Sequence, residues 1–136
     1  MTSEQEITTD PKTVPTCSVV VYGCAGASNL GQLANDIALR LDRMGLAELA
    51  CLTEIGAADD EGNGAPKRPV IAISGCAKGC CASMLERNGV EIASSILLAE
   101  RGVAKAKHVL VDPDSSERVF GQVLAELAPF LRSPAA

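Results

Sequence analysis

The chain has 136 residues, of which 47% are hydrophobic and only 2% aromatic. A chain of this length forms one domain whose core is large enough to fold without disulfide bonds. Its 12 basic and 17 acidic residues give a formal net charge of -5 at pH 7, which argues against nucleic acid as a partner. No stretch approaches the roughly 18 apolar residues of a membrane span, and residues 1–16 lack the basic and apolar regions of a signal peptide. We therefore expect a cytoplasmic protein that binds neither membrane nor nucleic acid.

The ends of the chain differ from its middle. Residues 1–16 are polar, contain two prolines and show no periodicity, so they are predicted to form a flexible N-terminal arm. A single α/β domain is expected over 17–130, followed by a short C-terminal tail over 131–136.

The first part of the domain alternates between strand and helix patterns. A β-branched run over 18–22 predicts a buried strand. Ser28 is the expected N-cap of a helix with apolar residues at helical spacing, and Gly45 is expected to end it. Residues 46–52 form a weaker strand candidate, and the polar, glycine-rich stretch 56–69 predicts a loop.

The alternation continues in the second part of the domain. Residues 70–73 predict a third strand, and a helix is expected over about 77–87. The apolar runs 94–98 and 107–111 are too short for periodicity to decide between strand and helix, and Asp112-Pro113 is expected to end the second run.

A last helix is predicted from a capping signal and an apolar face. Asp114 or Ser115 is the expected N-cap, Glu117 the expected partner in a capping box, and Pro129 the stop. Strands that alternate with helices predict a parallel sheet, so the expected fold is a three-layer α/β fold of the Rossmann-like or flavodoxin-like type. It would have about four parallel strands in the order 2-1-3-4.

Three of the six cysteines occupy corresponding places in this pattern, and a fourth lies close to the third. Cys24 follows the first predicted strand, Cys51 ends the second, Cys76 follows the third, and Cys80 lies one helical turn later. Because the carboxyl ends of parallel strands meet at one edge, the predicted order would bring these cysteines to one region. Four thiolates suit Zn²⁺, so we expect a zinc-binding protein for metal binding, sensing or trafficking. The sequence does not identify a protein partner.

Several alternatives remain open at this point. Cys81 lies beside Cys80 and is an alternative ligand, a buried hydrophobe or a redox partner, whereas Cys17 is expected to be inert. An iron–sulfur cluster on the same ligands, an open zinc position of a metal-dependent enzyme, or a reactive Cys80 or Cys81 thiol would define a redox protein or an enzyme instead. A phosphatase loop would need Arg six positions after Cys24, where Leu30 stands.

The same segments resemble a known family. The stretch 22–33, the pair of segments around Cys51 and Gly56, and Gly75-Cys76 with Cys80 are similar to the DGC-domain family. The resemblance runs from about residue 17 to 127 and includes 94–98 as the fourth strand.

The resemblance implies a site as well as a fold. The family is described as chelating zinc through four cysteines, which fall here on Cys24, Cys51, Cys76 and Cys80. Ser74 stands where the family has the Asp of its Asp-Gly-Cys motif, and Cys81 where it usually has a small residue. The biochemical role does not follow from the resemblance.

Overall fold

The sheet is parallel and has the predicted strand order. The computed structural model describes residues 18–57 and 66–131. The predicted arm over 1–16, Cys17 and nearly all of the tail lie outside these residues. Four strands are hydrogen-bonded in the order β2-β1-β3-β4, and every neighbouring pair is parallel. The expected arrangement is therefore confirmed.

Two buried strands form the centre of the sheet. β1 (Val20–Gly23) pairs with β3 (Val70–Ser74), with Val20 opposite Val70 and Gly23 opposite Ile73. Every residue of both strands is buried, as expected for a parallel sheet covered on both faces. The edges are the short β2 (Glu48–Leu49) and β4 (Ser94–Leu97), which settles the open choice for 94–98 as a strand over most of its length.

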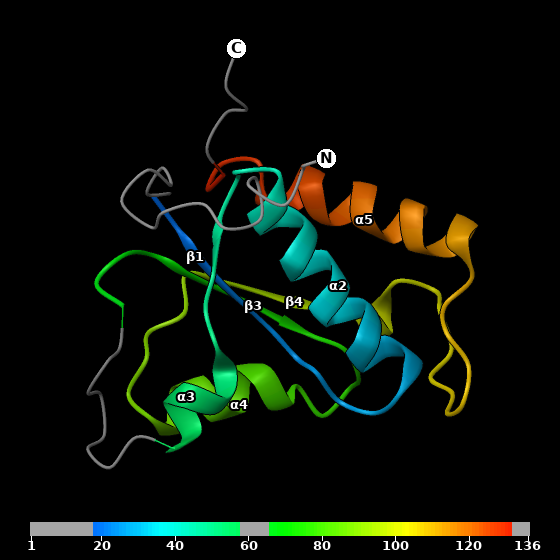
Figure 1. Ribbon diagram of the computed structural model, residues 1–136, viewed down its shortest axis with the longest axis horizontal. Helices are drawn as coiled ribbons and strands as arrows, with labels where there is room; N and C mark the ends of the chain where they lie inside the picture. The colour runs from blue at the N-terminus through cyan, green and yellow to red at the C-terminus, as the bar shows by residue number, and fades with distance from the viewer. Residues whose placement is uncertain (1–17, 58–65, 132–136) are drawn as a thin grey trace, which may run out of the picture.

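Helices cover both faces of the sheet (Figure 1). On one face lie the two long helices, α2 (Asn29–Arg43) and α5 (Pro113–Leu127). On the other lie the shorter α3 (Leu52–Ala57) and α4 (Cys80–Arg87). A single 3-10 turn, η2 (Leu98–Glu100), follows β4. The result is the expected three-layer α/β fold.

The α2 helix follows its sequence signals. The Ser28 hydroxyl accepts a hydrogen bond from the Gly31 N–H at 3.2 Å, which satisfies one of the free donors of the first turn. The apolar face is buried against the sheet, and Gly45 adopts φ +76° just beyond the C-cap. Both predicted ends of this helix are confirmed.

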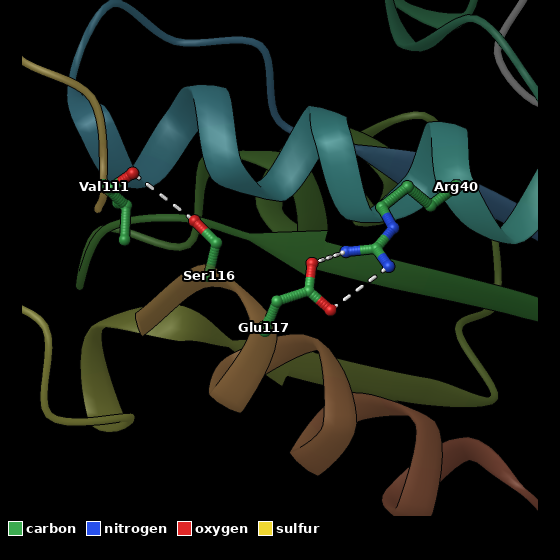
Figure 2. A network of polar contacts seen from close by, with 4 residues as sticks. All are labelled: Arg40, Val111, Ser116 and Glu117. Atoms are coloured by element: carbon green, nitrogen blue, oxygen red, sulfur yellow. Dashed lines mark hydrogen bonds and ion pairs between the residues drawn. The ribbon is translucent and has the colours of Figure 1, made fainter. Parts of the chain in front are cut away.

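The start of α5 differs from the prediction. Asp112, and not Asp114 or Ser115, is the N-cap, since its carboxylate accepts a hydrogen bond from the Ser115 N–H at 2.9 Å. Pro113 is the first helical residue, where its missing N–H costs nothing. The predicted partner in the capping box, Glu117, forms an ion pair with Arg40 of α2 at 2.8 Å, and Ser116 donates to the Val111 carbonyl at 3.4 Å (Figure 2).

Three further segments differ from their predictions. The α4 helix begins at Cys80 rather than near residue 77, because Gly79 lies in the left-handed region with φ +61°. The six-residue α3 begins at the last residue of the predicted strand over 46–52 and ends in the predicted loop over 56–69. Residues 107–111 form neither strand nor helix.

Candidate functional site

The four predicted ligands all follow the carboxyl ends of neighbouring strands. Cys24 comes directly after β1, Cys51 lies between β2 and α3, and Cys76 follows β3. Cys80 is the first residue of α4. Because β2, β1 and β3 are adjacent and parallel, the sheet delivers the first three cysteines to one edge. This edge is the candidate functional site.

Cys24 is held in a tight turn. Its side chain is 9% exposed, and the Gly26 N–H points at the sulfur with an N···S distance of 3.4 Å. A Cβ on Gly26 would lie 3.4 Å from that sulfur, so the absence of a side chain keeps the approach open. Gln32 of α2 donates from Nε2 to the Gly26 carbonyl at 2.8 Å. This hydrogen bond joins the Cys24 turn to the first turn of α2.

Glycines bring the Cys76 turn against the same helix. A Cβ on Gly75 would lie 2.5 Å from the Leu30 carbonyl oxygen and 2.6 Å from the Gly31 nitrogen. A Cβ on Gly31 would lie 2.7 Å from the Gly26 carbonyl oxygen. These separations are shorter than any side chain tolerates, so the backbone of the first turn of α2 packs directly against both cysteine turns.

Ser74, which stands in place of the family's Asp, has a structural contact. It is 1% exposed, and its hydroxyl accepts a hydrogen bond from the Ala82 N–H at 3.4 Å. The side chain therefore joins the end of β3 to the first turn of α4.

Cys51 is exposed and has a polar partner. Its sulfur lies 2.9 Å from the Thr53 hydroxyl. Hydrogen bonds from the Thr53 side chain and then from the Glu54 backbone stabilise the thiolate, so the pKa of Cys51 lies below its usual value. Thr53 was not a predicted site residue, because its position beside the sulfur depends on the short helix α3.

Cys80 and Cys81 have opposite environments. Cys80 is exposed and lines a surface hollow of about 820 Å³ together with Lys78 and Arg87. Cys81 is fully buried and donates to the Tyr22 carbonyl with an S···O distance of 3.5 Å. Burial, followed by repulsion from Cys24, raises the pKa of the Cys81 thiol to about 12. Cys80 is therefore accessible at the surface, whereas Cys81 belongs to the buried core.

Cys51 and Cys80 face adjoining hollows. A second hollow, of about 540 Å³, is lined by Cys51, Leu49, Ala50 and Asn35, and Met84 of α4 borders both hollows. The helices α3 and α4 also contact each other. The two exposed thiols thus lie on the same side of the sheet edge.

The four cysteines are of a type and number that suit zinc, but their sulfurs do not converge on one point in the structure. Four cysteines on adjoining turns supply the number and type of ligand of a closed zinc site. Within residues 18–57 and 66–131, however, no three Cys, His, Asp or Glu side chains converge closely enough to hold a metal ion. Zinc binding at these residues would therefore require the sulfurs to draw together.

Fold and site together define a small parallel α/β protein with cysteines at the carboxyl ends of its strands. Residues 20–123 match the DGC domain family, and the chain belongs to this family. It is similar to the anaerobic and virulence modulator AnvM of Pseudomonas aeruginosa, with 36% identity over 112 residues that cover 81% of this chain and 86% of the relative. No solved structure matches the chain significantly. None of the helices in the described part of the chain is long and apolar enough to cross a bilayer.

Proposed function

We propose that this protein is a zinc-binding regulatory module whose metal ligands are Cys24, Cys51, Cys76 and Cys80. The observation that supports the proposal is the placement of cysteines after three adjacent parallel strands, with a fourth at the start of the next helix. Chance placement of isolated cysteines would not favour one edge of the sheet. The relative's name describes a modulator, and we extend a modulating role to this chain.

Zinc would be bound by cysteines of unequal exposure. Cys24 is buried and its sulfur accepts from the Gly26 N–H, whereas Cys51 and Cys80 are exposed. We propose that the exposed thiols move towards Cys24 as the metal binds. Metal binding would then change the surface near α3 and α4. This change would be the basis for sensing.

Elemental analysis of the full chain, purified without oxygen, tests this proposal. About one zinc ion per chain is expected, and Ser substitution at any of the four ligands should lower it. Cys17→Ser and Cys81→Ala are the matched controls and should retain zinc. A Cys51→Ser variant with full zinc content would contradict the ligand set.

Chelation gives an independent measurement of the same site. Apparent zinc binding free energies of about 10–16 kcal/mol are comparable to the stability of a whole domain. A chelator should therefore lower the thermal unfolding midpoint of the zinc-loaded protein. An unchanged midpoint would argue against a structural role for the metal.

A thiol redox function is the second candidate, and the Cys51–Thr53 contact favours it. An exposed thiol whose thiolate is stabilised by hydrogen bonds reacts readily with oxidants. Metal-free protein with one fast-reacting thiol at Cys51 would support this function over zinc binding. Iron with visible absorption would instead indicate an iron–sulfur cluster on the same cysteines.

A further inference from the structure

The loop that joins η2 to α5 presents two adjacent apolar side chains to solvent. Val109 is 56% exposed and Leu110 is 79% exposed. Among the residues that the structure describes, the other exposed large hydrophobic side chains are Met44, the C-cap of α2, and Met84 of α4. A single exposed Leu is ordinary, but an exposed apolar pair in a loop can contribute a binding surface.

This loop has a defined conformation although it contains no helix or strand. The buried side chain of Asn29 donates to the Ala104 carbonyl at 3.0 Å and accepts from the Ala106 N–H at 2.8 Å. The Asn29 N–H also donates to the Ala106 carbonyl at 2.9 Å. Three hydrogen bonds thus fasten the loop to the first turn of α2, and a fastened loop loses little conformational entropy on binding.

The backbone at His108 is also unusual. His108 has φ +70° and is the one non-glycine residue with positive φ in the described segments. Such a conformation costs about 1–2 kcal/mol for a residue with a side chain, and it directs the chain just before Val109 and Leu110. The backbone conformation at His108 therefore contributes to the exposure of Val109 and Leu110.

The same loop is locally basic in an acidic protein. Residues 101–111 contain exposed Lys105 and Lys107 and no acidic residue, whereas the whole chain has a formal charge of -5. Asp112 and Asp114 follow at once, so the positive charge is confined to the loop. A groove of about 320 Å³ between the loop and α2, bordered by Leu110 and Leu39, lies beside the exposed pair.

We propose that residues 103–110 form a docking surface for a short acidic segment of a partner protein that contains apolar side chains. The apolar groups of that segment pack on Val109 and Leu110 and enter the groove, while its carboxylates pair with Lys105 and Lys107. This inference concerns a different part of the molecule from the cysteine site and does not depend on metal binding.

The charge distribution favours a short peptide over an extended polyanion. An anionic membrane or a nucleic acid would face the carboxylates that follow the loop, together with the net negative charge of the protein. A short acidic segment faces fewer carboxylates of the protein, of which Asp36 of α2 borders the groove beside the loop. The two lysines and two apolar residues match a segment of only a few residues.

Titration of the isotope-labelled full chain with short synthetic peptides of mixed Glu and Leu tests the proposal. The peptide should shift amide NMR signals within 103–111, and the matched peptide with Lys in place of Glu should not bind. Val109→Ser with Leu110→Ser, and separately Lys105→Glu with Lys107→Glu, should each weaken binding by roughly tenfold or more. Met44→Ser, which changes an exposed hydrophobic side chain elsewhere, is the control that should bind normally.

Two further measurements keep the test decisive. Unchanged unfolding midpoints will show that the surface variants are folded, and Asn29→Ala should weaken binding by loosening the loop. Equal affinity of the native chain and the Val109→Ser, Leu110→Ser variant would overturn the proposal, as would the absence of binding at about 1 mM peptide. Tighter binding to phosphatidylglycerol vesicles than to the acidic peptide would assign the loop to a membrane surface instead.

Discussion

Two turns that connect a strand to a helix differ sharply in this protein. The β1–α2 turn, residues 24–28, holds a buried cysteine and ends in the serine cap of a 15-residue helix. The β3–α4 turn, residues 75–79, holds a half-buried cysteine and ends in a left-handed glycine without a side-chain cap, before a helix of 8 residues. One half of the candidate site is therefore buried and capped by a side chain, whereas the other is more exposed and has no side-chain cap.

The largest expected effect concerns Gly75, where the β3–α4 turn contacts the first turn of α2. Gly75→Ala would place a Cβ 2.5 Å from the Leu30 carbonyl oxygen. The clash is with backbone, which cannot rotate away, so the free energy of unfolding should fall by about 2–4 kcal/mol. Urea denaturation measures this loss.

Gly79 provides the matched control for Gly75. A Cβ on Gly79 would meet nothing within 4 Å, although φ is +61°. Gly79→Ala should therefore cost only the left-handed backbone penalty of about 1–2 kcal/mol. If both substitutions destabilise the protein equally, the close approach of Gly75 to the Leu30 backbone is not what excludes a side chain at residue 75.

An effect of intermediate size is expected in the rates at which the cysteines of the candidate site react with an alkylating reagent. In reduced, metal-free protein, exposed Cys80 should react with iodoacetamide roughly tenfold faster than Cys24, which is buried against Gly26. Fully buried Cys81 should stay unmodified until the protein unfolds. Mass spectrometry of peptides from a time course resolves the three sites, and equal rates at Cys80 and Cys24 would contradict the contrast.

The smallest expected effect concerns the helix caps. Ser28→Ala removes the hydrogen bond to Gly31 and should lower the free energy of unfolding by about 1 kcal/mol. Ser83→Ala, on the exposed surface of α4, should change it by less than about 0.5 kcal/mol. A neutral Ser28→Ala variant would mean that backbone packing alone fixes the start of α2.

The regular parts of the fold were predictable because local and long-range signals agree there. For the buried β-branched strands and the serine cap of α2, the local sequence signals agree with the packing of the whole fold. The strand order was inferred from the positions of the cysteines. The predicted start of α5 was wrong because Asp112-Pro113 was interpreted as the end of the preceding apolar run. Proline at the first helical position is equally a start signal, and only packing of the helix decides between the two.

The site was predictable in its location and not in its detailed contacts. The edge of the sheet followed from the spacing of Cys24, Cys51 and Cys76, since topology alone places them there. The contact of Thr53 with Cys51 depends on a helix of six residues, which is too short for a periodic signal. The contact of Gly75 with Leu30 depends on how closely two elements approach, which no local pattern encodes.

Arg40 gives the attachment of α5 to α2 two components with different salt dependence. Its guanidinium pairs with Glu117 and also lies over the Phe120 ring, with 3.7 Å from Cζ to the ring centroid. Dissolved ions weaken the exposed ion pair, whereas the contact with the ring is short and partly shielded. In concentrated salt the ion pair of Arg40 with Glu117 should weaken, whereas the contact of Arg40 with the Phe120 ring should persist. This contact should keep α5 attached to α2.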